Sequence, residues 1–458
     1  MRRGTWLVAM GGVLTASLCL TSASEVGASG SHTVTWFVRA NPVENNWERN
    51  VAIPGFEKKY PQYHVKLIIS PGGASFDEKL AALFAAGTPP DVFSHWGQSG
   101  YAAYLARNMV QPLNPYLKKY HYNISFIPPR YLNYFKVKGN LYGIPMQSGP
   151  AVLFYNRSLF EKYHVPIPPL SWSDKAWNLT TVVNDALKLT HDTSNPAKAV
   201  WGINWRPTWW YWDMGWLWNA DPFNATGGPG ATAAYRPGDG RVTRAYLRKG
   251  EVAALQWEED LVTKYHVSPP QSGFQQFQTY NDPFASGRFG MEVEGIWYAH
   301  NLQTEHVTFK WGVAPWPYGP DGKDTTTTYT DPWMLGRGAK DPDGGFRLIE
   351  YLTHGQGLLG FSDVTHFFPL EPSLQNAWAR SLASVQGNTL TPYQYIRMAY
   401  GGLSHGFESP NHLLVGFSKL ITVWGQMATP ALNGQKPALA VWKSIVSAWN
   451  QDIKAGLQ

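Results

Sequence analysis

The chain contains 458 residues, of which 15% are charged and 15% aromatic, and its formal net charge is +6. Because no long Lys/Arg run accompanies this basic balance, nucleic-acid binding is not expected. A single cysteine excludes a disulfide framework. Stability must therefore come from apolar cores, which about 430 residues beyond a leader can build as two or three domains.

The N-terminus has the pattern of a secretory signal peptide. Two arginines precede an apolar run from Trp6 to Leu20, and small residues follow it. This run is too short to span a membrane. Cleavage is expected after Ser24 or Ala28, which makes the protein an exported one. The single cysteine, Cys19, lies inside the apolar run.

The first elements predicted after the leader are a strand, a helix and a second strand. Residues 33–38, TVTWFV, predict a buried strand that ends just before Asn41. The following helix is expected to break or kink near Pro54. Residues 64–69 then predict the second strand.

Residues 79–93, KLAALFAAGTPPDVF, are the most informative segment of the chain. Their apolar spacing predicts an amphipathic helix, which Gly87 ends in a left-handed conformation. A short strand then leads into His95 and Trp96. Ligands of open α/β sheets sit beyond the carboxyl ends of strands, so this polar and aromatic cluster indicates a ligand site.

The middle of the chain combines a predicted crossing strand with a dense aromatic run. GNLYGIP at 139–145 is followed by LFYN at 153–156, and residues 171–190 predict a helix. Within 201–218, Trp205, Trp209, Trp212 and Trp216 would share one face of a helix. Such a stripe is usually core, but Trp209 and Trp210 are the candidates for a ligand contact.

Two carboxylates on a predicted strand deserve comparison with a catalytic pair. Glu292 and Glu294 alternate along the segment that ends in Glu294-Gly295-Ile296-Trp297 and so point to the same side. Retaining glycosidases need carboxyl groups about 5–5.5 Å apart across the scissile bond. These two approach from one wall only. We therefore expect Glu294 to accept hydrogen bonds from a ligand, with Glu292 in solvent or paired with Arg288.

Three phrases in this order resemble one protein family. They are KLAALFAAGTPPDVF, the pair GNLYGIP and LFYN, and FASGRFGM followed by EGIW. Together they are similar to the sugar-binding group, family 1, of the extracellular solute-binding proteins of ABC importers, the group that includes maltose-binding protein. The resemblance implies an α/β, two-lobed periplasmic-binding-protein-like fold with a ligand cleft between discontinuous lobes.

The resemblance also implies three hinge crossings, expected near Ser148, Gly312 and Gly357. The corresponding division is a leader at 1–28, a first lobe at 29–147 and 313–356, and a second lobe at 148–312 and 357–458.

Candidate cleft residues come from the strand ends and loops that the resemblance places there. They are Asn41, Glu44, His95, Trp96, Gln147, Trp209, Trp210, Glu294, Gly295, Trp297, Asp331, Trp333 and His366. Indole faces stack on the C–H faces of sugars, and the carboxylates and amides bond hydroxyl groups. Trp297 is the leading candidate, although a Trp buried beneath a glycine turn remains the alternative.

The function implied is carbohydrate binding, of an oligosaccharide in particular, and delivery to the permease subunits of an ABC importer. A monomer without cofactor or enzymatic activity is expected. The histidines have no close metal-ligand spacing, so the sequence predicts no metal site. The leucine before Cys19 disfavours lipidation, which prefers a small residue there. A secreted glycoside hydrolase or lyase, and a same-fold binder of a non-sugar solute such as a polyamine, remain alternatives.

The low carboxylate content supports one further hypothesis. With 32 Asp and Glu in the whole chain, few native carboxylates would be neutralised at low pH, which limits acid destabilisation. The hypothesis is that the protein works in an acidic exterior. It predicts that the protein keeps its fold near pH 3.

Overall fold

The computed structural model describes residues 32–205, 212–223, 242–280, 282–320 and 322–456. The predicted leader with Cys19, and the candidates Trp209 and Trp210, lie outside this part of the chain. Among the described residues, no helix combines the length and the apolar character needed to cross a bilayer.

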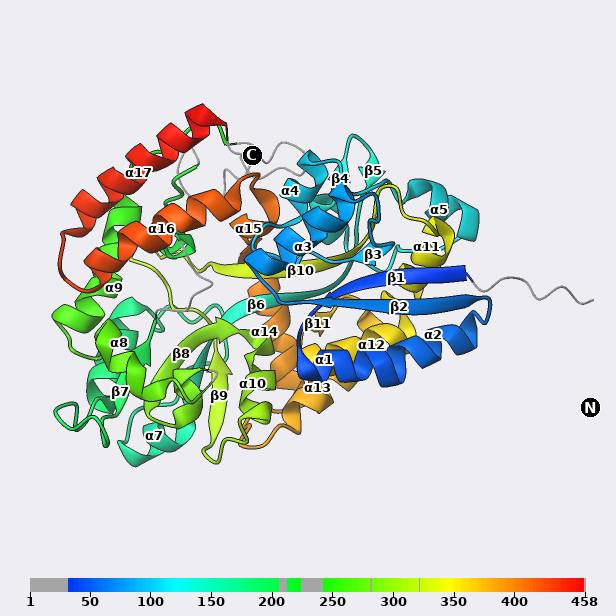
Figure 1. The fold of residues 1–458 in the computed structure, drawn as a ribbon. Helices are drawn as coiled ribbons and strands as arrows, with labels where there is room; N and C mark the ends of the chain where they lie inside the picture. Colours follow the sequence, from blue (N-terminus) through cyan, green and yellow to red (C-terminus); the bar gives the residue numbers. More distant parts are fainter. Residues whose placement is uncertain (1–31, 206–211, 224–241, 281, 321, 457–458) are drawn as a thin grey trace, which may run out of the picture.

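The strands form a large mixed sheet and a small hairpin (Figure 1). Their bounds are β1 His32–Arg39, β2 Tyr63–Ser70, β3 Val92–Phe93, β4 Lys136–Val137, β5 Asn140–Leu141, β6 Ile144–Asn156, β7 Trp201–Asn204, β8 Phe289–Gly295, β9 Trp311–Ala314, β10 Thr326–Leu335, β11 Phe368–Pro369 and β12 Gly406–Glu408. The large sheet has the order β2-β1-β3-β10-β6-β8-β7, with β9 and β11 also paired to β6 and β12 to β10.

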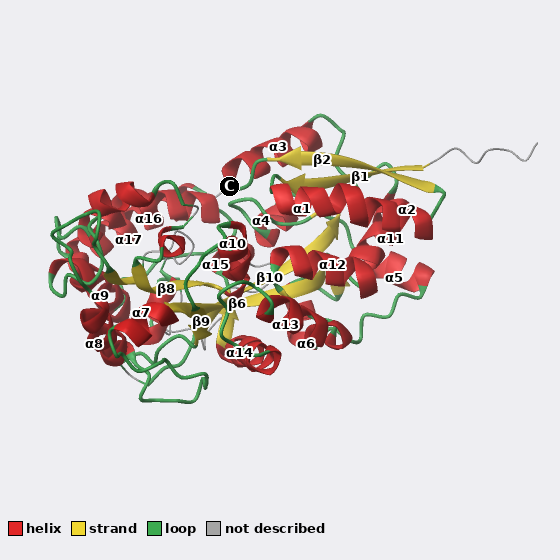
Figure 2. Ribbon diagram, turned by 90° about the horizontal axis from the view of Figure 1, so that it is seen from below, coloured by secondary structure: helices red, strands yellow, loops and turns green. Residues whose placement is uncertain are grey.

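Helices cover the strands in both halves of the molecule (Figure 2). Their bounds are α1 Pro42–Trp47, α2 Ile53–Lys59, α3 Ala74–Ala85, α4 Tyr101–Ala106, α5 Asn114–Tyr120, α6 Pro129–Tyr134, α7 Arg157–Lys162, α8 Leu179–Leu189, α9 Lys249–Thr263, α10 Ala299–Thr304, α11 Pro342–Leu352, α12 Gly355–Thr365, α13 Gln375–Ala383, α14 Pro392–His405, α15 Pro410–Leu413, α16 Phe417–Leu432 and α17 Ala438–Ala455. The predicted kink before Pro54 is a π-helical turn between α1 and α2.

The long strands β6 and β10 join the two lobes. Residues 144–150 of β6 pair with β10, and residues 151–156 pair with β8 and β9. At its other end β10 pairs with β3, so β10 completes the sheet that contains β1 and β2. Every residue of both strands is buried. The fold is the two-lobed arrangement that the sequence predicts.

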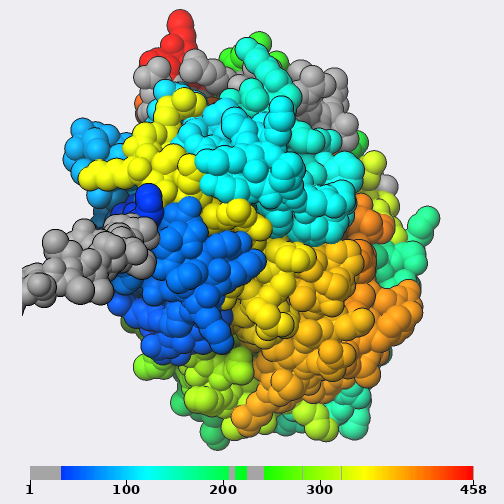
Figure 3. Space-filling view, turned by 90° about the vertical axis from the view of Figure 1, so that its right-hand side faces the viewer, coloured from blue at the N-terminus to red at the C-terminus, as the bar shows by residue number. Residues whose placement is uncertain are grey.

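The expected boundary residues fall within regular elements. Ser148 lies on β6, Gly312 lies on β9, and Gly357 lies on α12, which packs against α1 and α11. The residue numbers given for the lobe boundaries remain predictions. Segments that are far apart in the sequence lie side by side in the first lobe. Blue, cyan, yellow and orange segments share the face that is seen from the β1 side (Figure 3).

Two predicted helical segments differ from the structure. The helix expected at 171–190 begins only at Leu179, because the side chain of Asn178 accepts from the backbone N–H groups of Thr180 and Thr181 and caps it there. The aromatic run is not one helix: it opens with strand β7 and closes with a 3₁₀ segment at Asp213–Trp218. Of its five described tryptophans, Trp218 is half-buried and the other four are buried core residues, namely Trp201, Trp205, Trp212 and Trp216.

A buried carboxylate ties three elements of the first lobe together. Asp91, just before β3, accepts from the backbone and hydroxyl of Thr35 on β1 at 2.7 and 2.6 Å. Its second oxygen accepts from the backbone of Asp341, the N-cap of α11, at 2.9 Å. Charge-assisted hydrogen bonds of this kind are the strong ones.

We expect Asp91→Ala to lower the free energy of unfolding by about 3 kcal/mol, because it leaves buried donors without an acceptor. Urea denaturation monitored by Trp fluorescence measures this loss. Glu78→Ala, at an exposed position of α3, is the control and should change stability by less than about 0.5 kcal/mol. Equal stabilities of the two variants would contradict the assigned role.

Candidate functional site

A cavity of about 650 Å³ lies among the ends of strands from both lobes. It is lined by Arg39, Ala40, Asn41, Glu44, Gly72, Gly73, Ala74, His95, Trp96, Gly97, Gln98, Glu294, Trp297, His300, Asn301, Tyr329, Asp331, Thr365, Phe367, Asn411, His412 and Ile421. Seven sequence candidates are among them: Asn41, Glu44, His95, Trp96, Glu294, Trp297 and Asp331.

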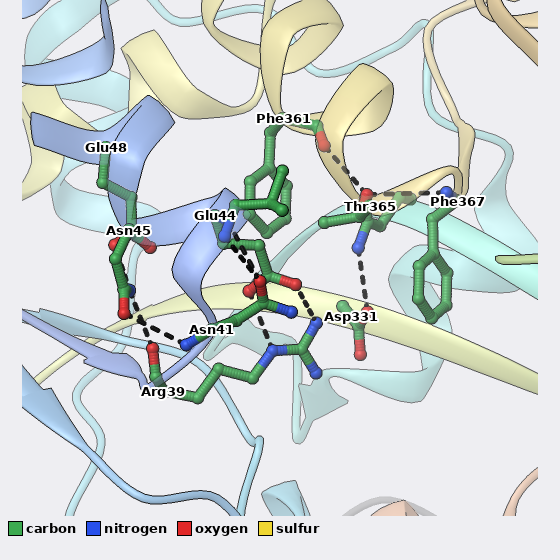
Figure 4. A network of polar contacts seen from close by, with 11 residues as sticks. Arg39, Asn41, Glu44, Asn45, Glu48, Asp331, Phe361, Thr365 and Phe367 are labelled. Atoms are coloured by element: carbon green, nitrogen blue, oxygen red, sulfur yellow. Dashed lines mark hydrogen bonds and ion pairs between the residues drawn. The ribbon is translucent and has the colours of Figure 1, made fainter. Parts of the chain in front are cut away.

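The N-terminus of α1 places an ion pair at the cavity (Figure 4). The Asn41 side chain caps α1 by accepting from the N–H groups of Val43 and Glu44 at 3.0 and 3.2 Å. Arg39, at the end of β1, donates to both carboxylate oxygens of Glu44 at 2.8 and 2.6 Å. This bidentate pair fixes a guanidinium beside the cavity and occupies the Glu44 carboxylate.

The half-buried Trp297 lies in an aromatic stack. Its ring stacks on Phe367 at 4.4 Å between centroids and meets Tyr329 edge-on at 5.2 Å. A Cβ at Gly149 or Gly295 would collide with the indole. Gly295 does not line the cavity; its role in this structure is to leave space for Trp297.

Trp96 and Trp333 have different roles although both were candidates. Trp96 lines the cavity, where the Arg39 guanidinium lies 5.0 Å from its ring centroid. Trp333 is fully buried behind it, edge-on to Trp96 at 5.0 Å and to Trp36 at 5.4 Å. Trp333 does not line the cavity although Asp331, two residues earlier on β10, does, because the register of β10 against β6 shifts between Asp331 and Pro332 and interrupts the alternation of side chains. The full burial of Trp333 gives no support to the predicted ligand contact.

The two carboxylates of β8 are both buried, and only Glu294 lines the cavity. Burial, and then the charge of Asp282, raises the pKa of Glu294 to about 8. Glu294 is therefore protonated at neutral pH and can donate as well as accept. Glu292 is neither solvated nor paired with Arg288: it is fully buried and accepts from Asn204 at 2.9 Å. The expectation that Glu292 lies in solvent or pairs with Arg288 is therefore wrong.

A chain of buried hydrogen bonds fixes Asp331. His95 Nε2 lies 3.2 Å from one carboxylate oxygen, and Gln147 Nε2 donates to the other at 3.0 Å. Gln147 in turn accepts from the Thr365 hydroxyl at 3.2 Å. Gln147 is fully buried and does not line the cavity; it positions Asp331. Although burial acts in the opposite direction, the contact with His95 holds the pKa of Asp331 below its usual value.

His412 of α15 completes this cluster. Its ring stacks on His95 with centroids 3.8 Å apart, and its Nδ1 lies 2.6 Å from the buried Glu408 carboxylate. Burial, and then the charge of His412, lowers the pKa of His95 to about 4. Ligand atoms of His95, Asp331 and His412 all lie within 4.8 Å of one another, so these three could hold a metal ion.

His366 is a buried neighbour of the cavity. It ends α12 in the left-handed conformation, with φ of 59°, and its carbonyl accepts from the Trp378 indole. Burial, and then the charge of His300, lowers the pKa of His366 to about 3. Its chain neighbours Thr365 and Phe367 line the cavity, whereas His366 does not.

Several lining residues were missed by sequence reasoning. Tyr329 lies two residues before the predicted Asp331 on β10, so alternation along the strand could have suggested it. Phe367 directly follows the predicted His366. His300 and Asn301 lie in the first turn of α10, three and four residues after the predicted Trp297. His412 gave no signal in the sequence, because its neighbours in the cluster are far away along the chain. His95 is 317 residues before it and Asp331 is 81 residues before it.

Buried protonated carboxylates predict a fall in stability as pH rises. Burial is the largest cause that raises the pKa of Glu48, Asp213 and Glu294 to about 8. Between pH 6.5 and 8 the folded chain holds protons that the unfolded chain has lost, so the free energy of unfolding decreases. Each group contributes on the order of 1 kcal/mol over this window. The lowered histidine pKa values act in the opposite direction, but only below about pH 6.5.

We therefore expect Glu294→Gln to flatten this decrease by about 1 kcal/mol. The measurement is urea unfolding at pH 6.5 and pH 8. Glu78→Gln, on the exposed side of α3, is the control and should show the same decrease in the free energy of unfolding as the wild-type chain. Stability that rises with pH across this window would contradict the protonation assigned to the buried acids.

Comparison with known proteins agrees with this architecture. A binding protein of Brucella abortus (strain 2308) is 23% identical over 306 residues, which cover 64% of this chain. The match spans 65% of that relative's length. An ABC substrate-binding protein of Listeria monocytogenes, solved in complex with cycloalternan, superposes with a TM-score of 0.75 at 18% identity, covering 93% of this chain and 100% of that one.

A second solved structure, maltose-bound MalE3 of T. maritima, gives a TM-score of 0.70 at 17% identity and covers 92% of this chain and 99% of that one. These likenesses show the two-lobed fold. The family model described as bacterial extracellular solute-binding protein matches residues 41–354, more than half of the chain. The chain therefore belongs to the bacterial extracellular solute-binding proteins.

Proposed function

We propose that this chain binds a carbohydrate of oligosaccharide size in the interlobe cavity and delivers it to the permease of an ABC importer. The observation that carries the proposal is the aromatic wall of the cavity, built by Trp96, Trp297, Tyr329 and Phe367 beside charged and amide groups. Aromatic faces suit the apolar faces of sugar rings, and the polar groups suit their hydroxyls. The volume of about 650 Å³ is that of a small-molecule site.

Ligand-dependent closure is the proposed mechanism. Arg39 and His95 reach the cavity from the lobe of β1 and β3, and Glu294 and Trp297 reach it from the end of β8. A solute that contacts both sets stabilises the closed arrangement of the lobes by its differential affinity. The permease would then recognise the lobe surfaces in that closed state.

The cavity charges favour a sugar over a polyamine. Three carboxylates line it, but Glu44 is paired with Arg39 and Asp331 is bonded to His95 and Gln147. The raised pKa of Glu294 leaves that group neutral at pH 7. A cationic solute would find little uncommitted negative charge, whereas the hydroxyl groups of a sugar can bond to a neutral group such as the protonated Glu294.

A role as a glycoside hydrolase has less support. Glu292, the partner that a catalytic pair with Glu294 would need, is buried away from the cavity and bonded to Asn204. Binding without chemistry predicts that the sugar is recovered unchanged after prolonged incubation. Chromatographic detection of shortened products would instead favour the enzyme.

The proposal includes export and a soluble working form. We infer that the leader is cleaved after Ser24 or Ala28, that Cys19 is removed with it, and that the mature chain acts as a monomer. Intact mass measurement of the secreted protein tests both cleavage positions. A lipid-modified cysteine at the mature N-terminus would overturn this part.

We expect Trp297→Ala to weaken oligosaccharide binding by about 30-fold, since a buried aromatic contact of this kind is worth about 2 kcal/mol. The wild-type chain should respond to sugar with a rise in thermal stability and a change in Trp fluorescence. Trp218→Ala, at a half-buried Trp outside this cavity, is the matched control. Unchanged affinity in Trp297→Ala, or no response of wild type to any sugar, would overturn the proposal.

A further inference from the structure

The cluster at the floor of the cavity has the composition of a transition-metal site. His95 comes from the loop after β3, Asp331 from β10 and His412 from α15, and all three side chains are buried. Two imidazoles and one carboxylate are the donor set of open, three-ligand zinc sites. Calcium and magnesium prefer oxygen donors, so a borderline-soft ion fits better.

The distances in the cluster suit one shared ion. His95 Nε2 and Asp331 Oδ1 are 3.2 Å apart. Two ligands of a tetrahedral Zn²⁺ with bonds of 2.0–2.1 Å are separated by about 3.3 Å. One ligand atom from each of the three residues lies within 4.8 Å of the others. A metal ion can therefore take the place of the proton between His95 and Asp331 with small side-chain movements.

Outer hydrogen bonds already orient the donors. His412 Nδ1 is 2.6 Å from Glu408, which leaves Nε2 as the free nitrogen of that ring. Glu408 is itself held by the backbone and hydroxyl of Thr330 at 2.8 and 2.7 Å. Asp331 keeps its second oxygen on Gln147. Carboxylate–histidine contacts and bonded carboxylates are the outer shell that fixes metal ligands in proteins.

We propose that His95, Asp331 and His412 bind a divalent transition-metal ion of the Zn²⁺ class, with an open coordination position facing the cavity. The three residues line the cavity, so a water molecule or an oxygen of a bound solute can complete the coordination. This inference goes beyond carbohydrate binding and is tested without any sugar, so either can fail alone.

Titration of the untagged, chelator-stripped chain with ZnCl₂ tests the site by calorimetry. We expect one Zn²⁺ per chain at micromolar affinity or tighter, a rise in melting temperature, and no comparable effect of Mg²⁺. Asp331→Asn and His412→Gln should each weaken binding at least 10-fold. His405→Gln is the matched control, since His405 pairs with Asp324 at 2.7 Å without belonging to the cluster.

Absence of stoichiometric Zn²⁺ binding to the wild-type chain, or equal affinity in Asp331→Asn, would overturn the proposal. Should both variants fail to fold, X-ray absorption at the zinc edge of the wild-type complex decides. Scattering from two imidazole rings supports the assigned ligands. A spectrum without imidazole scattering contradicts them.

Discussion

The antiparallel pairing of β6 with β10 is the interaction on which the rest of the molecule depends. These strands are buried along their whole length, so every polar side chain on them needs a partner within the protein. Ser148 meets Thr330 at 2.9 Å and Gln147 meets Asp331, while Glu408 satisfies Thr330 from β12. Among these polar residues only Asp331 lines the cavity, so the pairing of β6 with β10 acts on the site by holding Asp331 in place. The same pairing that joins the lobes therefore also sets the geometry of the site.

Much of the fold could be predicted because it follows from local patterns. The apolar run of β1, the Gly87 stop and the Pro54 kink each depend on a few neighbouring residues. The predicted start of α8 was wrong for a local reason too, because the cap at Asn178 outweighs the apolar spacing of the residues before it. The helix predicted for the aromatic run was wrong because Trp is equally compatible with a helix face and with a strand. Burial in tertiary contacts decides between the two.

The site was less predictable, because burial and side-chain direction decide it. Trp96 and Trp333 are both tryptophans near strand ends, yet the first lines the cavity and the second fills the core behind it. The cluster of His95, Asp331 and His412 brings together three distant segments of the chain, and no rule on residue spacing could predict that they meet. Glu294 was assigned as an acceptor, and only its burial reveals that it is protonated. Buried acids of this kind are already protonated at neutral pH and so do not add to acid destabilisation, whereas the buried neutral histidines His95 and His366 oppose tolerance of acid.

The position of β10 between β3 and β6 has a kinetic consequence. Phe93 pairs with Met334, so the first lobe cannot close its sheet until more than two thirds of the chain is available. Pairings of such long sequence separation form slowly, because loop closure costs entropy before the contacts repay it. A chain that must cross a membrane before it works gains from this delay. A sheet that closes late leaves the first part of an exported chain without its complete pairing for longer, and an unfolded chain is the form that a narrow channel can pass.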